Sequence, residues 1–334
     1  MPPRVSVLMP CFNHGEFIED AIASVRAQTV QDFEIIVVDD GSTEAATVAA
    51  LGAVQAPDVV VHRTANRGLP AARNFAAAHA SGEVFCALDA DDRLAPTWFA
   101  KALALLDAQP ATAFVSHWLE TFGDEHWTWT PERCDLQALL LHNTVNGAAL
   151  VRRTAFESVG GYDERMREGC EDWDFWLRLV ESGRHGAIVP EVLFYYRRRA
   201  GSMSRVMLDA AERRPLETLI RKHRAAYSRH LLDVLVTKAA ETRMLAREVG
   251  RLERESQTVL APSLDRAREE LSAVGAKAAR VKEARAKEEE REHLTCKAAE
   301  LEREIAALRA SWSWRVTAPL RRIYSMLTAR GSRR

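Results

Sequence analysis

The chain has 334 residues, 47% of them hydrophobic and 28% charged, and its formal net charge is −1. This length predicts about two domains, and the near-neutral charge argues against a general nucleic-acid-binding protein. Five scattered cysteines without CxxC spacing favour free thiols in a reducing compartment over a disulfide framework or a zinc site. We find neither a signal peptide nor a run of about 18 apolar residues that could span a membrane, so we expect a cytoplasmic protein.

The first half of the sequence alternates short β-rich segments with helical ones. Strands are predicted at residues 4–9, 33–38, 59–62 and 83–88. Helices are predicted from apolar spacing at residues 16–28, 44–55 and 69–80. Such alternation indicates βαβ units and therefore an α/β fold with a mainly parallel sheet and flanking helices.

Further elements follow in the middle of the chain. We expect strands at residues 112–119 and 147–151 and an amphipathic helix at 172–181. A strand pair at 185–189 and 192–198 is predicted to close the domain.

From about residue 206, glycine and proline almost vanish and the composition becomes typical of long helices. Heptad spacing is present in two stretches: Leu264, Ala267, Leu271, Val274, Ala278 and Val281, then Leu294, Ala298, Leu301, Ile305, Leu308 and Trp312. This all-α region therefore predicts a coiled coil at 263–310, although alanine at several seam positions makes the interface thin. Pro262 is predicted to break the helix and to separate the coiled coil from a helical extension at 206–261.

Four polar clusters directly follow the first four predicted strands. They read "PCFNHGEF" from Pro10, "DDGS" from Asp39, "NRG" from Asn66 and "DADD" from Asp89. A single cluster of this kind could merely cap a helix, and for "DDGS" taken alone a helix cap is as good an explanation as a ligand site. Because parallel α/β sheets bind ligands beyond the carboxyl ends of their strands, four clusters in succession predict one pocket.

The two aspartates of D-x-D, Asp89 and Asp91, suit a divalent cation and the phosphates that it bridges. Mg²⁺ and Mn²⁺ prefer carboxylate and phosphate oxygens. The sequence has no phosphate-binding G-x-x-x-x-G-K-[ST] loop and no G-x-G-x-x-G fingerprint. We therefore expect the metal to neutralise the phosphates.

Seven motifs from Arg4 to Arg205 together resemble the family 2 glycosyltransferases of GT-A fold, in the family's order and spacing. They are "VSVLMPCFNHGEFIEDAIASVRAQT", "IIVVDDGS", "NRGLPAARN", "LDADD", "GGYDE", "EDWDFWLRL" and "YYRRRAGSMS". The resemblance implies a catalytic domain at residues 1–205 that transfers a sugar from a nucleotide-diphosphate donor to an acceptor hydroxyl. It also implies inversion at the anomeric carbon and Mn²⁺ or Mg²⁺ as cofactor.

Carried over residue by residue, the resemblance places Pro10 and Asn13 in the base pocket and gives Asp39 a hydrogen bond to the base. Arg73 would lie near the nucleotide, Asp89 near the ribose and metal, and Asp91 would be the principal metal ligand. The remaining donor-binding residues that it implies are Glu16, Asp40, Asn66, Gly68, Ala90 and Arg199.

The resemblance identifies Asp172 as the general base, with Glu171 beside it. An inverting displacement needs the acceptor hydroxyl deprotonated as it attacks, and burial beside a like charge raises the pKa of a carboxylate toward neutrality. The alternative is that both residues only cap the following helix. Trp173 and Trp176 are candidates to contact the acceptor sugar, although helical spacing suggests that one of them belongs to the core.

Arg199 departs from the family pattern, in which many relatives carry a histidine that joins the metal shell. A guanidinium stays protonated and cannot bind a metal, but it can pair with a diphosphate. The other histidines show no ligand spacing and are interpreted as ordinary surface or core residues.

The last segment, residues 311–334, is basic, carries aromatic residues and has an amphipathic pattern. Such a tail suits the inner face of an anionic membrane, and docking on a partner or on the coiled coil is an equal alternative. Similar endings recur in bacterial surface-polysaccharide glycosyltransferases, which favours a glycan or lipid-linked glycan acceptor. A homo-oligomer through the coiled coil and peripheral membrane contact are the predicted interactions, and nucleic acid is not an expected partner.

The sequence therefore predicts a metal-dependent inverting glycosyltransferase of surface-polysaccharide synthesis. One alternative is a coiled-coil scaffold with an inactive glycosyltransferase domain. A nucleotidyltransferase is less favoured, because the segment after the first strand has no lysine-rich, glycine-rich loop.

Overall fold

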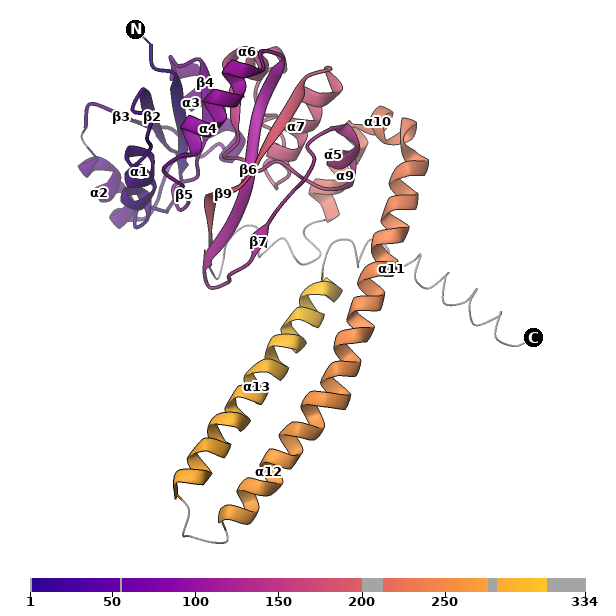
Figure 1. Ribbon diagram of the computed structural model, residues 1–334. Helices are drawn as coiled ribbons and strands as arrows, with labels where there is room; N and C mark the ends of the chain where they lie inside the picture. Colours follow the sequence, from indigo (N-terminus) through magenta and orange to yellow (C-terminus); the bar gives the residue numbers. More distant parts are fainter. Residues whose placement is uncertain (1, 55, 200–212, 276–280, 311–334) are drawn as a thin grey trace. The chain divides into compact units, whose positions relative to one another are not determined.

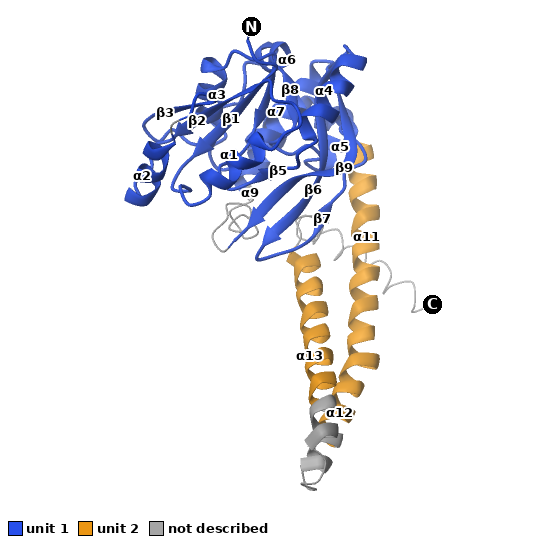
Figure 2. Ribbon diagram, turned by 60° about the vertical axis from the view of Figure 1, so that its left-hand side comes forward, with its two compact units in different colours: residues 1–231 blue, residues 232–334 orange. Residues whose placement is uncertain are grey.

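The computed structural model describes residues 2–54, 56–199, 213–275 and 281–310 (Figure 1). The chain divides into two compact units, Met1–Leu231 and Leu232–Arg334 (Figure 2). The first unit contains a nine-stranded sheet with flanking helices, and the described part of the second is helical.

Four parallel strands form the first half of the sheet: β1 (Val5–Cys11), β2 (Phe33–Asp39), β3 (Val59–Arg63) and β4 (Val84–Ala87). β1 lies between β2 and β4, and β3 pairs with β2. The helices between them are α1 (Ile18–Arg26), α2 (Ala45–Ala53) and α3 (Leu69–His79). Every residue of β1 is buried, as expected for a strand covered on both faces. These elements confirm the strands, helices and parallel sheet predicted for this half.

The sheet continues from β4 in the order β8, β6, β9 and β5, and β7 pairs with β6. The strands are β5 (Arg93–Leu94), β6 (Thr112–Gly123), β7 (Thr128–Trp129), β8 (Leu150–Arg152) and β9 (His185–Arg198). The helices are α4 (Trp98–Ala108), α5 (Leu136–Leu141), α6 (Arg153–Ser158) and α7 (Glu171–Glu181). β8 is antiparallel to both β4 and β6, while β9 is parallel to β6. The carboxyl ends of β1, β2, β4, β6 and β9 therefore meet at one edge, where the segment entering β8 also lies.

β9 is a single strand, so the predicted strand pair at 185–198 was wrong. His117 of β6 pairs with Val189, and Trp118 pairs with Val192. Pro190 and Glu191 between them are left as a bulge in the ladder, consistent with a proline that has no N–H to donate. The sequence pattern of a bulge resembles that of a turn, and the two segments on either side were taken for separate strands.

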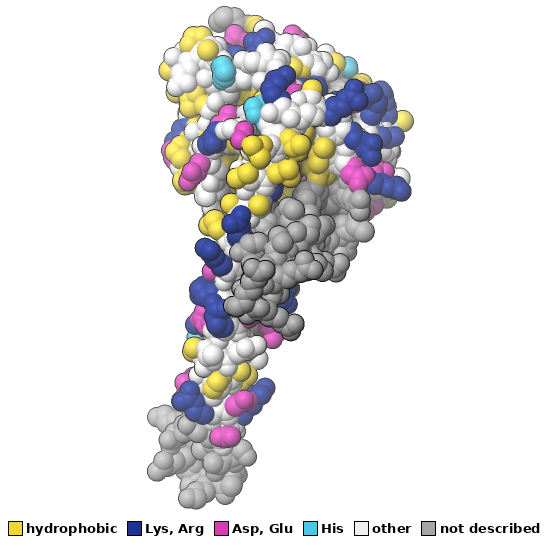
Figure 3. Space-filling view, turned by 90° about the vertical axis from the view of Figure 1, so that its right-hand side faces the viewer, with side chains coloured by type: hydrophobic (Ala, Val, Ile, Leu, Met, Phe, Trp, Pro, Cys, Tyr) yellow, Lys and Arg dark blue, Asp and Glu magenta, His cyan; other side chains and the backbone are white. Residues whose placement is uncertain are grey.

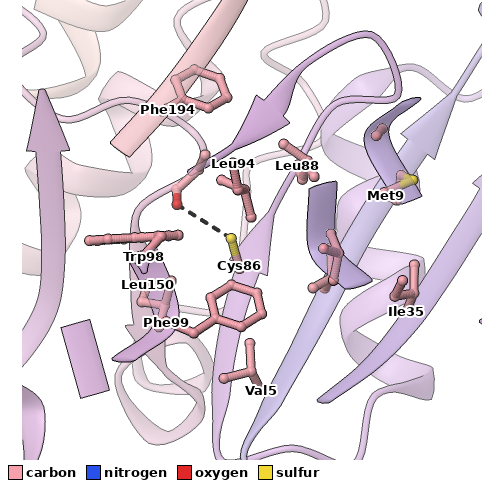
Figure 4. Packing of buried hydrophobic residues seen from close by; sticks show 14 of the residues in the cluster. Val5, Met9, Ile35, Cys86, Leu88, Leu94, Trp98, Phe99, Leu150 and Phe194 are labelled. Atoms are coloured by element: carbon pink, nitrogen blue, oxygen red, sulfur yellow. Dashed lines mark hydrogen bonds between the residues drawn. The ribbon is translucent and has the colours of Figure 1, made fainter. Parts of the chain in front are cut away.

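The main core packs against β4 and anchors the segment that follows it (Figure 4). Trp98 and Phe99 at the start of α4 are fully buried there, and the Cys86 thiol donates a hydrogen bond to the carbonyl of Ala148 at 3.4 Å. Leu88 and Ala90 are also fully buried in this cluster. Burial of these apolar side chains fixes the turn that carries Asp89 and Asp91.

After the sheet, α9 (Arg213–Lys222) and α10 (Arg224–Arg229) complete the described part of the first unit. The next helices are α11 (Leu231–Glu255), the π-helical turn η2 (Ser256–Leu260), α12 (Ala261–Gly275) and α13 (Val281–Ala310). The helical segment thus continues through Pro262, and the predicted break there was wrong. A π turn directly before the proline accommodates the missing N–H and the ring without ending the helix.

α12 and α13 lie side by side in Figures 1 and 2. Leu252, Leu260 and Leu301 are buried between the helices of this unit. Other hydrophobic residues of the second predicted heptad stretch pack against them: Leu294, Ala298, Ile305 and Leu308. Lys and Arg side chains as well as Asp and Glu side chains lie on the described surface of these helices (Figure 3). The hydrophobic residues of this heptad stretch therefore pack against helices of the same chain, and a coiled coil between chains stays a prediction.

Several sequence-based expectations lie outside the described residues, namely the tail at 311–334, Trp312 and the segment at 200–212. No helix in the described ranges is long and apolar enough to cross a membrane. No disulfide joins the five cysteines, all of which lie in the described ranges.

Candidate active site

A pocket of about 840 Å³ opens at the edge of the sheet where the parallel strands end. Residues of the polar clusters and of α7 line it together: Pro10, Asp40, Asn66, Gly68, Arg73, Asp89, Asp91, Glu171, Asp172, Trp173 and Arg199. These residues are far apart in the sequence, so the prediction that the strand-end clusters form one pocket is confirmed. Five other proposed site residues do not line it: Asn13, Glu16, Asp39, Ala90 and Trp176.

Asp40 shapes the first wall of the pocket. Its buried carboxylate accepts hydrogen bonds from the backbone N–H groups of Arg67, at 2.9 Å, and Gly68, at 2.8 Å. Gly68 has a φ of 92°, and a Cβ there would lie 3.1 Å from Nε of Arg167. A glycine is therefore favoured at this turn, which begins α3 and brings "NRG" beside "DDGS".

Asn13 and Asp39 brace the same wall from behind. The side-chain oxygen of Asn13 accepts hydrogen bonds from the N–H groups of Thr43 and Glu44, at 2.9 and 3.1 Å. Asp39 accepts one from the N–H of Ser42 at 2.8 Å and forms an ion pair with Arg63 at 3.0 Å. Asn13 therefore holds the loop after β2 against the loop after β1, whereas Asp39 fixes the loop after β2 and pairs with the end of β3. Glu16 is exposed on the surface.

The aspartates after β4 face different partners. Asp89 pairs with Arg73 at 2.8 Å, and Asp91 lies 3.4 Å from a guanidinium nitrogen of Arg199 and 3.7 Å from Nδ1 of His14. Burial raises the pKa of Asp91, although the nearby His14 opposes this. Asp92 is buried, accepts the N–H of Arg197 at 2.8 Å, and has a strongly raised pKa because of burial and the adjacent aspartates. The three carboxylates thus lie close together, and Arg73 and Arg199 supply countercharge to Asp89 and Asp91.

Arg73 connects the two halves of the pocket. Its buried guanidinium donates one hydrogen bond to Glu171 and another to Asp89, each 2.8 Å long. The side chain also lies over the ring of Tyr162, with the guanidinium carbon 5.4 Å from the ring centroid. The guanidinium of Arg73, on α3, therefore holds the carboxylate of Asp89 after β4 and the carboxylate of Glu171 at the start of α7.

The first turn of α7 carries Glu171 and Asp172. Cys170 before them has a φ of 61°, a left-handed conformation that is uncommon for a non-glycine residue. Asp172 accepts hydrogen bonds from the backbone N–H of Trp173 at 2.7 Å and from the side-chain amide of Asn143 at 3.1 Å. Burial raises the pKa of Asp172. Burial and the neighbouring charge of Asp172 raise the pKa of Glu171 to about 7. Both carboxylates can therefore exchange protons closer to neutral pH than free ones.

After Glu171 and Asp172, Trp173 is the one further residue of α7 in the pocket lining. Trp176 is fully buried against Phe114 and Phe175, whereas Trp173 lines the pocket and donates its indole N–H to the carbonyl of Leu139 at 2.6 Å. Of the two tryptophans proposed for acceptor contact, only Trp173 is placed to reach a ligand. Trp176 belongs to the core.

Behind α7 lies a group of ionised side chains that we call the Asp174 cluster. It consists of Asp174, Arg178, Glu181, Lys222 and His223. The fully buried Asp174 carboxylate lies 2.8 Å from Arg178, 2.7 Å from Lys222 and 3.0 Å from Nε2 of His223. Nδ1 of His223 lies 2.6 Å from Glu181. The cluster joins the ends of α9 and α10 to α7, and its position shows that Asp174 is not a candidate base.

Among the pocket-lining residues that sequence reasoning missed, Asn143 and His14 contact proposed site residues. Asn143, in the polar segment before β8, contacts Asp172, and His14, in the cluster after β1, lies near Asp91 and Arg199. The strand-end rule that identified the other clusters would have found His14. It would not have found Asn143, because that residue precedes its strand and reaches the edge only because β8 runs in the opposite direction.

The donor set after β4 fits a hard divalent cation. Asp89 and Asp91 both line the pocket and offer carboxylate oxygens, which suit Mg²⁺ and Mn²⁺. Among the residues that the structure describes, no group of three or more His, Cys, Asp or Glu could hold a metal alone. Two protein carboxylates would leave coordination positions for phosphate oxygens and water.

Comparison with known proteins points to sugar transfer. The model of "Glycosyl transferase family 2" matches residues 6–162, and that of "Glycosyltransferase like family 2" matches 132–238. An uncharacterized glycosyltransferase of Haemophilus influenzae is 27% identical over 185 residues, which is 53% of this chain and 62% of that protein. The putative glycosyltransferase EpsE of Bacillus subtilis is 26% identical over 215 residues, 61% of this chain and 76% of its own length.

Among solved structures, the chain is similar to S. aureus TarS 1–349 in complex with UDP-GlcNAc. The TM-score is 0.53 and the identity 19%, over 60% of each chain. The match therefore spans less than two thirds of that structure and of the Haemophilus relative. At this identity the likeness concerns the fold.

Proposed function

Because the chain belongs to the family 2 glycosyltransferases of GT-A fold, we propose that it moves a sugar from a nucleotide-diphosphate sugar to an acceptor hydroxyl. The acceptor in this proposal is a glycan or lipid-linked glycan of surface-polysaccharide synthesis. One observation carries the proposal. Asp40 and Asn66, Asp89 and Asp91, and Glu171 and Asp172 line a single pocket although they come from widely separated parts of the chain.

The nucleotide end of the donor would lie at the wall formed by the loops after β1, β2 and β3. That wall is braced by the hydrogen bonds of Asp40, Asn13 and Asp39. The S. aureus TarS structure contains UDP-GlcNAc, so UDP-sugars are the first donors to test.

A divalent cation, Mn²⁺ or Mg²⁺, would be held by Asp91 and Asp89 and would neutralise the charge of the leaving diphosphate. The raised pKa of Asp91 supports this assignment, since a buried carboxylate with incomplete countercharge gains from a cation. Arg199, 3.4 Å from Asp91, is placed to pair with the same diphosphate.

Asp172 would act as the general base in an inverting transfer. Asn143 and the N–H of Trp173 orient its carboxylate, and its raised pKa improves its match to a proton transfer near neutral pH. Glu171 lies beside it but pairs with Arg73, which assigns Glu171 a supporting role.

Two interactions of the C-terminal region remain part of the proposal. Residues 311–334 would contact an anionic membrane surface, and the heptad stretches would gather the tails of several copies, which raises their combined affinity. Flotation of the full chain with anionic liposomes, compared with a chain that ends at residue 310, tests the membrane contact. Equal flotation of the two chains would contradict the role of the tail.

The transferase activity is tested by donor hydrolysis. The full chain is incubated with a panel of UDP-sugars and Mn²⁺, and the released nucleotide is measured for the wild type and for Asp172→Asn. Loss of the base should lower turnover by about 10²–10⁴-fold with little change in donor affinity. Asp265→Asn, on exposed helix surface, is the matched control and should behave as wild type.

Near-normal turnover of Asp172→Asn would move the base to another residue. A wild-type chain that neither binds nor hydrolyses any nucleotide sugar would contradict the proposal and favour an inactive scaffold.

A further inference from the structure

The connection from β6 to β7 places an indole at the pocket. Trp127 lines the pocket and is 45% exposed, whereas its neighbour Trp129 packs against the main core. A large aromatic side chain left this open at the wall of a pocket points to contact with a ligand.

The backbone around Trp127 is fixed before any ligand arrives. Thr121 donates its N–H to the carbonyl of Trp127, and the N–H of Trp127 donates to the Thr121 hydroxyl, both at 2.9 Å. Leu119 pairs with Trp129 in the ladder that follows. The indole N–H of Trp127 lies 3.4 Å from a carboxylate oxygen of Glu125, and the same oxygen lies 3.1 Å from Nε of Arg198. With the N–H engaged outside the pocket lining, the hydrocarbon part of the indole is what a ligand would meet.

Trp127 lies in the same half of the pocket as the proposed base. Asn143 contacts Asp172, and Asn146 in the same segment lies 3.4 Å from His117 of β6. Two residues further along β6, Leu119 pairs with Trp129 of β7, the strand that Trp127 directly precedes. The wall that carries Asp40 follows β2, on the other side of the sheet's edge. Three strands, β1, β4 and β8, lie between β2 and β6, so these two strands are about 19 Å apart at the usual strand spacing.

The polarity of this half of the pocket selects a sugar ring over a lipid chain. Trp127 and Trp129 line the pocket together with the side-chain amides of Asn143 and Asn146. A pyranose has an apolar C–H face that packs on an aromatic ring and hydroxyl groups at its edge that need donors and acceptors. An isoprenoid or acyl chain would need an apolar wall without amides, because unpaired polar groups are costly to bury.

We propose that Trp127 is the stacking platform for the terminal pyranose of the acceptor glycan, which it presents to the side of the pocket that carries Asp172. This inference rests on the proposed transferase function. Stacking on a preorganised ring orients the acceptor at little entropic cost. Trp127 is therefore a specificity-determining residue for the acceptor, with no part in donor binding.

Binding of acceptor sugars can be measured without the donor. The full chain is titrated with methyl α- and β-pyranosides of glucose, galactose, mannose and N-acetylglucosamine, and saturation-transfer NMR reports both binding and the sugar protons that face the protein. Three variants are compared: Trp127→Phe keeps an aromatic ring, Trp127→Leu keeps only apolar volume, and Trp118→Phe is the matched control. Trp118 lies in β6 outside the pocket lining, with its indole N–H bonded to the carbonyl of Pro131.

At least one glycoside should bind the wild type, with the strongest transfer from its ring C–H protons. Trp127→Leu should weaken that binding by about two- to tenfold, while Trp127→Phe and Trp118→Phe stay within about twofold. Full binding by Trp127→Leu, or no binding of any glycoside to the wild type, would overturn the inference. UDP-sugar hydrolysis, measured separately on the same samples, should be equal in the wild type and in the Trp118→Phe control. Its absence in the wild type would instead count against the proposed function.

Discussion

Replacing His223 by glutamine should destabilise the first unit by about 2 kcal/mol at slightly acid pH. Both ring nitrogens of His223 face carboxylates, Asp174 at 3.0 Å and Glu181 at 2.6 Å. A carboxylate only accepts hydrogen bonds, so both nitrogens donate and the ring is an imidazolium. The bond to the fully buried Asp174 should contribute about 1.5–3 kcal/mol, and the bond to the partly exposed Glu181 about 0–1 kcal/mol. Glutamine can keep one neutral hydrogen bond and loses the charge.

The effect should depend on pH in a defined direction. Burial alone would lower the pKa of His223, but the hydrogen bonds to Asp174 and Glu181 outweigh it, and the pKa is raised overall. The folded-state pKa therefore exceeds the unfolded value of about 6.5. The stabilisation is fully present below that value and is lost as the pH rises through the folded-state pKa. The difference between wild type and His223→Gln should accordingly shrink on the alkaline side.

Urea denaturation followed by tryptophan fluorescence measures this difference, because Trp98 and Trp176 are fully buried in the first unit. Free energies of unfolding would be compared from about pH 6 to about pH 9, on either side of the ordinary histidine pKa. His185→Gln, at an exposed histidine, is the control and should leave stability unchanged. A deficit of His223→Gln that stays constant over this range would refute the assignment of a charged ring.

Three further predictions concern the pocket. Asp91→Asn should weaken Mn²⁺ binding in the presence of UDP by more than about tenfold, as measured by electron paramagnetic resonance of free Mn²⁺. Undiminished turnover of the wild type in EDTA would contradict a role for the metal. Glu171→Gln should remove a step near pH 7 from the pH profile of turnover, since Glu171 has a pKa of about 7, and an unchanged profile would assign that step elsewhere. Arg73→Lys should lower both donor affinity and turnover, because the ammonium is a single point of charge and lacks the rigid, planar fork whose two nitrogens reach Glu171 and Asp89 separately. Calorimetry with UDP and donor hydrolysis would each have to show a loss.

The parts of the fold that follow from local pattern were predictable. β1 to β4 and α1 to α3 have apolar spacings that belong to one element each, and their alternation indicates a parallel sheet. The strand-end clusters could be assigned to one pocket because parallel strands share an edge.

The wrong predictions concern two prolines, each of which is compatible with more than one local backbone structure. Pro190 lies in a bulge of one strand where the sequence predicts two strands, and Pro262 follows a π turn where the sequence predicts a break in the helix. A proline excludes one hydrogen bond but does not say how the chain compensates. At Pro190, pairing with β6 on both sides of the proline keeps the chain in one strand with a bulge.

Contacts between distant segments could not be predicted from one sequence. Asn143 reaches Asp172 only through the reversed direction of β8, and His223 meets Asp174 only once α10 docks on α7. Helical spacing likewise could not tell which of Trp173 and Trp176 lies in the core. Each of these depends on the packing of whole elements rather than on periodicity.

The return of β9 to the turn after β4 has a consequence for how the protein is made. Arg197 donates its backbone N–H to the buried Asp92 and its Nε–H to the carbonyl of Asp91, across 105 and 106 residues of chain. Contacts of such long sequence separation form late, because the intervening loop must be closed first. A nascent chain that has not yet released β9 from the ribosome therefore has the aspartates without the strand that fixes them. Competence to bind a donor should appear only after about residue 199 has emerged, so that no partly synthesised domain takes up nucleotide sugar.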